Sequence, residues 1–455
     1  MALLFRVAAL AAACLISTGA LAATIVLRGA TVLDMTGAAP RRADVVVDGE
    51  RIAAVLPQGQ GRGDRIVDLT GKFLLPGFTD LHAHVLVHPV DARGHLGPRT
   101  DPALTLATLK LLLAYGVTTV RDVGAETEAA VEYRKELAAR AIPGPRLFTC
   151  GRILDAGNVT SEPFARIDTA EEAREEVDRQ ARAGVDCIKA YASVGPDLLR
   201  AIIDEAHARD LPVLGHLLST SWKDAVDLGI DGIEHAAPWT NELIGRNLER
   251  DLFGRVEWLE RIDAASTRVQ ELIASLARRR VPVDLTLIAM HTKLYGDSDR
   301  WQHNPDLALA PPRMVAGFRA GAFTRSWTKG QYARAHAAWP DLLAWVRALY
   351  DGGVILTAGT DTPNPWIVPG ASLHDELLLL EEAGIPRAEV LRIATRNAAI
   401  ALHRESEMGT IEPGKSADLV ALSKDPLADL HNTREIQLVM QRGREVDRAA
   451  LLPRR

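Results

Sequence analysis

The stretch "LLPGFTDLHAHVLV", Leu74 to Val87, decides how the fold of this chain is interpreted. Apolar, strand-forming residues dominate it, so it reads as a buried strand. His82 and His84 nevertheless lie inside it, one residue apart. Alternate side chains of a strand share a face, so both imidazoles point the same way. They are either satisfied core histidines or ligands of a metal ion.

Composition narrows the class of protein without deciding between these interpretations. The chain has 455 residues, of which 47% are hydrophobic and 25% charged, as in an ordinary soluble enzyme. This length predicts a large core with a smaller second domain. A net charge of -6 and the lack of a dense Lys/Arg tract argue against a nucleic-acid binder.

Residues 1–22, "MALLFRVAALAAACLISTGALA", have the pattern of a secretory signal peptide. Arg6 precedes a short apolar run, and Ala20-Leu21-Ala22 is a small-x-small cleavage site before Ala23. The run is too short to span a bilayer comfortably, so we expect no stable membrane anchor after cleavage. The expected location is the periplasm or the medium. The alternatives are a buried N-terminal helix and a lipoprotein signal around Cys14.

Cleavage would leave two cysteines, Cys150 and Cys187, which are too few for a disulfide framework in a chain of this length. A zinc site made of four cysteines needs more of them, and a site made of cysteine and histidine pairs needs a spacing that the chain lacks. Any metal must therefore be held by histidines, carboxylates or a less usual ligand.

Two kinds of segment alternate along the mature chain. Residues 23–75 and 404–455 consist of short strands and turns, which predicts one small β-sandwich domain built from both termini. Residues 76–403 alternate strands with helices, which predicts a (β/α)8 TIM barrel. Its eight expected strands are 77–85, 116–124, 145–153, 186–192, 211–217, 232–237, 281–289 and 354–362.

The helices and connections of the barrel carry their own signals. Thr169 and the acidic residues after it predict a capped helix that ends at Gly184. Residues 196–210 have apolar positions at helical spacing. Enlarged connections at 238–280 and 295–339 follow the sixth and seventh strands, where barrel loops carry chemistry. They are either substrate walls or packing and oligomer contacts.

Polar residues recur where barrel strands deliver side chains to the mouth. They are His82, His84, Lys189, His216, His235 and Asp361. Taken alone, each histidine is more often a hydrogen-bonded core residue, and Asp361 could simply begin a turn. Four histidines and an aspartate that converge on one mouth together indicate a metal site.

Lys189 is the most informative member of this set. A lysine in a buried strand loses hydration and tends to become neutral. A neutral amine can react with carbon dioxide to form a carbamate, which is an anionic ligand able to bridge two cations. The alternative is an ion pair with a carboxylate such as Asp186 or Glu234.

With these residues placed, the chain resembles the amidohydrolase superfamily. The resemblance rests on "PGFTDLHAH", "IKAYAS", "VLGH", "GIEH" and "AGTD", and on "MGTIEPGKSADLVAL" at the return to the small β domain. Residues 370–402 are similar to the imidazolonepropionase-like and Xaa-Pro or Xaa-Arg dipeptidase group. Residues 151–163 depart from it, because they lack the histidine that such dipeptidases often carry there.

The resemblance implies two divalent metal ions, most often zinc, in a fixed arrangement. His82, His84 and Asp361 would bind one ion, His216 and His235 the other, and N6-carboxylated Lys189 would bridge them. Asp361 would also be catalytic, moving a proton from metal-activated hydroxide to the leaving amine. Tyr191 would donate a hydrogen bond to the oxyanion. His291 and His374, like Tyr191, are candidates for substrate binding.

We therefore expect an exported binuclear hydrolase that cleaves an amide bond of a dipeptide or an N-acyl amino acid. An alternative is hydrolysis of a cyclic amide, a lactone or a phosphotriester by the same site, and a third is deamination. A binding protein that has lost its metals is disfavoured, because every expected ligand is present. No nucleic-acid or membrane partner is expected, and a homo-oligomer is compatible with the sequence. Side-chain specificity and native metal are left open, although loop residues Arg152, Arg300 and Arg313 would suit a substrate carboxylate.

Overall fold

The computed structural model describes residues 23–88, 101–157, 159, 163–240, 243–244, 252–320 and 327–453. The predicted signal peptide, residues 1–22, lies outside this range. None of the helices in the described part of the chain is long and apolar enough to cross a membrane.

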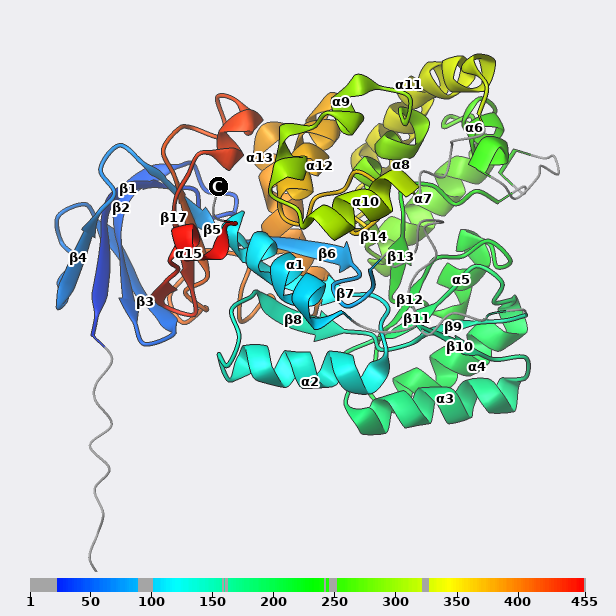
Figure 1. Ribbon diagram of the computed structural model, residues 1–455, viewed down its shortest axis with the longest axis horizontal. Coiled ribbons are helices and arrows are strands. Elements are labelled where there is room, and N and C mark those ends of the chain that lie inside the picture. The colour runs from blue at the N-terminus through cyan, green and yellow to red at the C-terminus, as the bar shows by residue number, and fades with distance from the viewer. Residues whose placement is uncertain are drawn as a thin grey trace, which may run out of the picture.

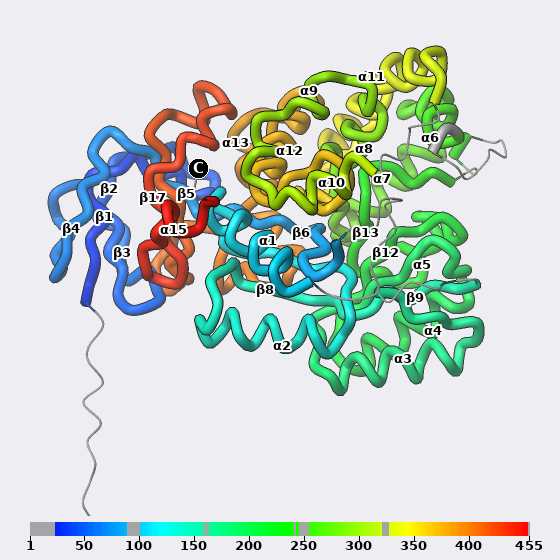
Figure 2. Tube along the Cα trace, in the orientation of Figure 1, coloured from blue at the N-terminus to red at the C-terminus, as the bar shows by residue number. Residues whose placement is uncertain are grey.

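Strands from the two ends of the chain form one eight-stranded sheet (Figure 1), in the order β18-β17-β16-β5-β1-β2-β3 with β4 beside β1. Its strands are β1 (Ile25–Val32), β2 (Arg41–Asp48), β3 (Arg51–Pro57), β4 (Arg65–Asp68), β5 (Phe73–Pro76), β16 (Leu419–Leu422), β17 (Ile436–Gln441) and β18 (Arg444–Glu445). The two termini meet because β16 pairs antiparallel with β5, from Leu419 opposite Pro76 to Leu422 opposite Phe73. Figure 2 shows the blue and red ends of the trace side by side.

The central part of the chain forms a barrel of parallel strands. They are β6 (Phe78–Ala83), β7 (Val117–Asp122), β8 (Arg146–Thr149), β11 (Ile188–Ala190), β12 (Val213–Gly215), β13 (Gly232–Glu234), β14 (Val283–Asp284) and β15 (Leu356–Thr357). A short strand, β9 (Ile153–Asp155), pairs with β11, and β10 (Phe164–Arg166) pairs with the other edge of β9. A large cluster of buried apolar side chains fills the space between these strands and the surrounding helices. The predicted fold class, a TIM barrel with a small β domain from both termini, is confirmed.

The barrel closes at two seams where the regular ladders stop. At one seam, the backbone N–H of Leu81 donates to the carbonyl of Ala358 at 3.1 Å, and Ala83 bridges Thr362. At the other, the N–H of Asp186 donates to the carbonyl of Thr149 at 2.8 Å. A disulfide between Cys150 and Cys187 lies directly beside this second seam. The sequence argues only against a framework of several disulfides, and the two cysteines form one buried disulfide.

Helices cover the outside of the barrel and form its enlarged connections. The helices along the first half are α1 (Pro102–Ala114), α2 (Thr127–Ala138), α3 (Ala170–Ala183), α4 (Pro196–His207) and α5 (Trp222–Leu228). The connection after β13 contains α6 (Leu252–Leu259) and α7 (Thr267–Arg279). The connection after β14 contains α8 (Leu287–Leu294), α9 (Asp299–Gln302), the 3-10 helix Pro305–Ala308, α10 (Pro312–Ala320) and α11 (Lys329–Asp351).

The last helices return the chain to the small domain. They are α12 (Ala371–Glu382), α13 (Arg387–Arg392), the π-helix Ile393–Asn397, α14 (Ala398–Ala401), the 3-10 helix Leu430–Arg434 and α15 (Arg448–Leu451). The predicted helix after Thr169 has its capping box with Glu172 and ends at Gly184, whose φ is 92°. The expected seventh strand is too long, because only Val283–Asp284 is extended and Leu287 begins α8. A buried apolar run of this kind fits a strand or a helix equally well.

Candidate metal centre

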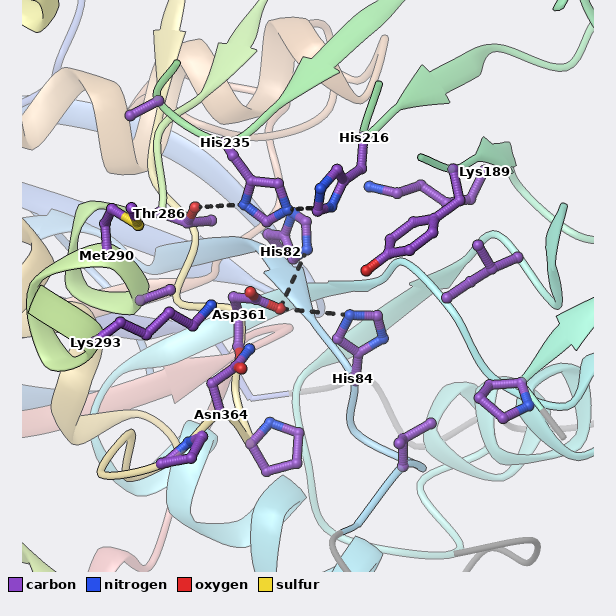
Figure 3. Close-up of a pocket in the computed structure, with 18 of the residues that line it drawn as sticks. His82, His84, Lys189, His216, His235, Thr286, Met290, Lys293, Asp361 and Asn364 are labelled. Carbon is purple, nitrogen blue, oxygen red and sulfur yellow. Dashed lines mark hydrogen bonds and ion pairs between the residues drawn. The ribbon is translucent and has the colours of Figure 1, made fainter. Parts of the chain in front are cut away.

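Three predicted ligands converge at the mouth of the barrel. His82 and His84 come from β6 and its end, and Asp361 lies in the turn after β15. The Nε2 atoms of both histidines lie 3.5 Å from Oδ1 of Asp361. These donor atoms lie within 4.8 Å of one another, so one cation could contact all three. Figure 3 shows Asp361 placed between the two imidazoles.

A second pair of imidazoles lies beside this group. His216 follows β12 and His235 follows β13, and Nε2 of His235 is 2.8 Å from Nδ1 of His216. The rings of His82 and His235 are 4.7 Å apart between centroids, so the two groups share one site. Burial lowers the pKa of both His216 and His235 well below the usual value. They are therefore neutral, which is the form that binds a metal.

Lys189 lies on β11 with 1% of its surface exposed, and its Nζ has no hydrogen-bond partner within the described structure. Its nearest carboxylate oxygen among the ion pairs is Oε2 of Glu234, 3.9 Å away. Burial lowers the pKa of Lys189 to about 8, even though Glu234 opposes this. The other proposed partner, Asp186, instead pairs with Arg134 at 2.7 Å. An orphaned, partly neutral amine beside four imidazoles fits a site that holds metal ions.

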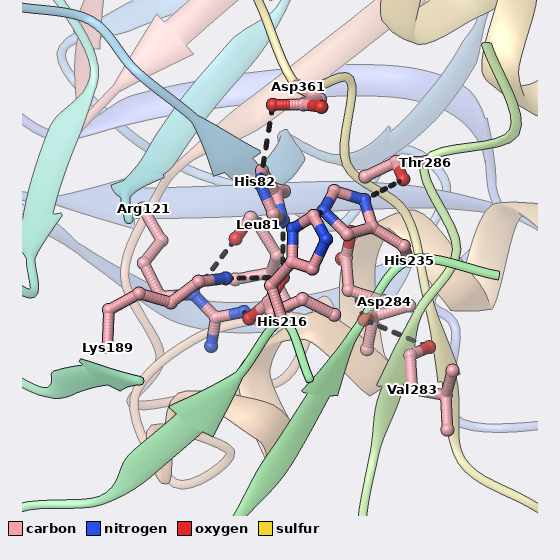
Figure 4. Close-up of polar contacts among 12 residues, drawn as sticks. Leu81, His82, Arg121, Lys189, His216, His235, Val283, Asp284, Thr286 and Asp361 are labelled. Carbon is pink, nitrogen blue, oxygen red and sulfur yellow. Dashed lines mark hydrogen bonds and ion pairs between the residues drawn. The ribbon is translucent and has the colours of Figure 1, made fainter. Parts of the chain in front are cut away.

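Glu234 fixes the orientation of His82 from below the site. Its carboxylate accepts from Nδ1 of His82 and, at 3.0 Å, from Nη2 of Arg121, whose Nε donates to the carbonyl of Leu81. Figure 4 shows Arg121 and Lys189 on the same side of His82. Although burial opposes ionisation, Lys189, Arg121 and His82 hold the pKa of Glu234 below its usual value. A carboxylate on Nδ1 leaves Nε2 of His82 free to bind a metal.

A second possible cation cluster consists of His82, Glu234 and Asp284. Glu234 is already engaged by Arg121 and Nδ1 of His82, and Asp284 accepts from the Thr357 hydroxyl at 2.9 Å. We therefore treat this cluster as the support of His82 and not as a separate metal site.

The backbone at the site is strained where two of the ligands attach. His235 has a φ of 74° and Asp361 a φ of 59°, both in the region that non-glycine residues seldom adopt. Gly359 lies where a Cβ atom would come within 2.5 Å of Cβ of His82. Only glycine lets the turn before Asp361 approach β6 this closely.

Tyr191 lines the same cavity, whereas the other two proposed substrate contacts do not. The ring of Tyr191 lies 4.5 Å from that of His216, and burial raises its pKa to about 12, so the phenol keeps its proton. His291 is buried against Trp301, whose Nε1 donates to it at 3.0 Å. His374 contacts the Thr433 hydroxyl and the Tyr115 carbonyl. Both histidines pack the fold and are absent from the described lining of the cavity.

The arginines named from the loops also point elsewhere. Arg152 donates to the carbonyl of Phe164, Arg300 lies over the ring of Trp301, and Arg313 pairs with Asp101. Besides Lys189, the basic lysine and arginine side chains among the described lining residues are Arg255 on α6 and Lys293 on α8, neither of which the sequence pattern singles out. Their only signal in the sequence is their place in or beside the enlarged connections. The cavity measures about 480 Å³.

Comparison with known proteins gives the following matches. The Amidohydrolase family profile matches residues 73–446. Imidazolonepropionase from Agrobacterium fabrum is 25% identical over 401 residues, which cover 82% of this chain and 81% of that protein. N-acyl-D-glutamate deacylase from Alcaligenes xylosoxydans xylosoxydans is 43% identical, but over only 60 residues, 13% of this chain and 12% of the relative. A Xaa-Pro dipeptidase with bound methionine has a similar fold, with a TM-score of 0.70, 18% identity, and coverage of 93% of this chain and 99% of the other.

Proposed function

The chain belongs to the amidohydrolase family, and from this premise we propose that it is an exported, binuclear metal-dependent enzyme. It is a hydrolase of carbon–nitrogen bonds, and the bond we propose is the amide of a dipeptide or an N-acyl amino acid. The observation that carries the proposal is the buried Lys189 amine without a hydrogen-bond partner, beside the ligand set of His82, His84, His216, His235 and Asp361.

The proposed arrangement assigns each side chain a place. His82, His84 and Asp361 would hold one divalent ion, His216 and His235 the other, and Lys189 as a carbamate would bridge them. To form the carbamate, the neutral Nζ attacks the carbon of carbon dioxide and loses one proton, which leaves an anionic carboxylate on nitrogen. Zinc suits this mixture of imidazole and oxygen ligands.

Bound ions would polarise the amide carbonyl and make a water nucleophilic at neutral pH. The remaining chemistry belongs to the side chains. Although burial opposes ionisation, His82 and His84 hold the pKa of Asp361 well below its usual value, so it is ionised and able to accept a proton. The same carboxyl would then protonate the leaving amine. The protonated phenol of Tyr191 would donate a hydrogen bond to the oxyanion.

Export is supported by two independent features. Residues 1–22 have the pattern of a signal peptide. The buried Cys150–Cys187 disulfide is of a kind that persists in oxidising compartments and is rare in the cytosol. We propose a periplasmic or secreted enzyme.

A related candidate is hydrolysis of a cyclic amide, a lactone or a phosphotriester at the same site. It is favoured by the match to imidazolonepropionase over 82% of this chain. Parallel assays of linear amides, cyclic amides and esters on one preparation would separate the two functions.

The decisive experiment is the metal content of protein purified with bicarbonate, for the wild type, Lys189→Ala and the surface control Lys223→Ala. Lys223 is exposed and pairs with Asp227 at 2.7 Å. We expect about two metals per chain in the wild type and the control, and fewer in Lys189→Ala with loss of hydrolysis. One metal in all three proteins would reject the bridged pair and favour a mononuclear ring-opening or deaminating enzyme.

A further inference from the structure

We propose that Arg255 and Lys293 bind the carboxylate of the substrate, and that the substrate is an N-acyl amino acid and not a free dipeptide. This inference rests on the proposed amide hydrolysis, within which it selects one of two substrate classes. It concerns two basic side chains of the cavity lining, Arg255 on α6 and Lys293 on α8, which are not among the predicted metal ligands.

Both cations line the cavity that holds the predicted metal ligands. Arg255 belongs to α6 in the connection after β13, and Lys293 belongs to α8 in the connection after β14. Arg255 opposes the charge of Lys293 electrostatically, and both cations are attracted by Asp361. In Figure 3 the side chain of Lys293 extends toward Asp361. A carboxylate held by these cations would lie in the same cavity as the predicted metal ligands, and the adjacent amide would then come within reach of those ligands.

Arg255 is held in place by a packed aromatic cluster. Its guanidinium carbon lies 5.6 Å from the ring centroid of Trp239, whose ring packs edge-on against Trp258 at 5.5 Å. Trp258 is buried, and its Nε1 donates to the carbonyl of Thr240 at 2.8 Å. A rigid cation loses little conformational freedom when it binds an anion, which favours a specific carboxylate contact.

Lys293 is likewise carried by an anchored helix. The first turn of α8 donates to the buried carboxylate of Glu376, from the N–H of Leu287 at 2.9 Å and the N–H of Ile288 at 2.6 Å. Burial lowers the pKa of both Arg255 and Lys293. A carboxylate bound by two partly desolvated cations makes charge-assisted hydrogen bonds, which are stronger than hydrogen bonds to a neutral group.

The cavity lining also contains apolar side chains. Among them are Val87, Ile153 on β9 and Phe164 on β10. Among the described lining residues, Asp361 is the one acidic side chain, and it faces the predicted metal site. A free ammonium group would find no other carboxylate on this lining. An uncharged acyl group suits an apolar surface, whereas burying an unpaired ammonium is unfavourable.

Three matched substrates test the two ends of the ligand separately. They are an N-acetyl amino acid, its C-terminal carboxamide, and the glycyl dipeptide of the same amino acid, assayed across apolar side chains of both configurations. We expect kcat/KM to be at least about tenfold higher for the acid than for the carboxamide or the dipeptide. The carboxamide lacks the negative charge that the two cations attract, and the dipeptide adds an ammonium group to a lining with apolar side chains. Equal rates on acid and carboxamide would overturn the carboxylate subsite. A faster dipeptide would overturn the N-acyl assignment.

Variants test whether the preference for the acid over the carboxamide arises from Arg255 and Lys293. Arg255→Met and Lys293→Met should reduce the preference for acid over carboxamide by about tenfold, mainly through KM, and Arg255→Lys should restore part of it. Arg261→Met is the matched control, since Arg261 lies just beyond α6 and pairs with Glu257 at 2.9 Å on the surface. An unchanged preference in folded Arg255→Met and Lys293→Met would overturn the assignment.

Binding to metal-free protein separates this inference from the proposed function. Calorimetric titration should show the N-acetyl amino acid binding the wild type and Arg261→Met more tightly than Arg255→Met, with the carboxamide binding weakly to all three. If this pattern holds while the metal-loaded enzyme hydrolyses none of the substrates, the proposed function fails and the subsite stands. If hydrolysis occurs but acid and carboxamide bind alike, the subsite fails and the function stands.

Discussion

At the scale of single residues, Glu234 links the predicted metal site to the interior of the barrel. It contacts Nδ1 of His82 and Nη2 of Arg121, and both of these side chains are buried. The arrangement orients the imidazole so that Nε2 faces Asp361. Because Glu234 contacts Nδ1 of His82, we expect any effect of Glu234 on metal binding to act through His82.

Replacing Glu234 with glutamine should weaken metal binding by about 10–100-fold, because supporting carboxylates raise the basicity of a ligating histidine. Competition with a coloured chelator would measure the affinity. Glu257→Gln is the control, since that carboxylate pairs with Arg261 on the surface. An unchanged affinity, accompanied only by a lower unfolding temperature, would show that Glu234 stabilises the fold without orienting His82.

His374 makes a separate prediction about pH. Its two ring nitrogens contact the Thr433 hydroxyl at 2.9 Å and the Tyr115 carbonyl at 3.0 Å, and burial lowers its pKa to about 3. The unfolded chain takes up this proton near pH 6.5, whereas the folded protein does not. Protonation of His374 in the unfolded chain therefore does not reduce the free energy of unfolding above pH 6.5, but it reduces that free energy progressively as the pH falls toward 3.

In urea titrations, the difference in unfolding free energy between the wild type and His374→Gln should be smaller at pH 5 than at pH 7.5. The gap in unfolding free energy should narrow by about 2 kcal/mol, since glutamine does not titrate. The variant should keep the wild-type kcat/KM, because His374 does not line the cavity. Parallel stability curves would contradict the buried neutral state of His374.

At the scale of elements, the seam between β8 and β11 depends on few interactions. Asp186 and Thr149 exchange two contacts there, of 2.8 and 2.9 Å, and the Cys150–Cys187 disulfide lies next to them. Val123 and Leu214 pack around the buried sulfurs. The disulfide joins the three-stranded and seven-stranded parts of the barrel where the ladder is weakest.

Removing the disulfide with Cys150→Ala and Cys187→Ala should lower the free energy of unfolding by about 2–4 kcal/mol, because the unfolded chain is no longer constrained. Chemical denaturation of both proteins, with and without reductant, measures the effect. Reductant should destabilise the wild type and leave the double variant unchanged. If the free energy of unfolding of the wild type did not change once both cysteines were shown to be reduced, the proposed role of this disulfide would be contradicted.

At the scale of the whole molecule, the proposed ligands come from elements far apart in the chain. β6, β11, the residues directly after β12 and β13, and the turn after β15 each contribute at least one. Metal ions bound by these ligands would stabilise the folded barrel over the unfolded chain. We therefore expect folding of the barrel and metal binding to be coupled.

Metal removal should lower the unfolding temperature of the wild type, and added Zn²⁺ should restore it. Metal at about 100 times its dissociation constant would contribute about 2.7 kcal/mol. Calorimetric scans of chelated and reloaded protein measure the change, and His216→Asn should show a smaller recovery. Equal unfolding temperatures for metal-free and metal-loaded wild type would show that these side chains do not bind the metal jointly.

How far the sequence predicts this molecule varies from one element to another. The capped helix after Thr169 follows from local hydrogen-bonding and charge, and it ends at the expected glycine. The seventh strand is shorter than its apolar run predicts, because the apolar residues Leu287 to Ala289 fit a buried helix as well as a buried strand. His291 and His374 have the residue type of a substrate contact, but packing turns both away from the cavity.

The sequence by itself determined the barrel, the small domain from both termini and the identity of the proposed ligands, because strand periodicity and the ends of barrel strands are local properties. Tertiary structure alone decided what surrounds those ligands. Glu234 meets His82 across 152 residues, and Arg255 and Lys293 line one cavity from separate connections. Such contacts depend on how loops and helices pack around the barrel, and no local sequence pattern encodes this packing.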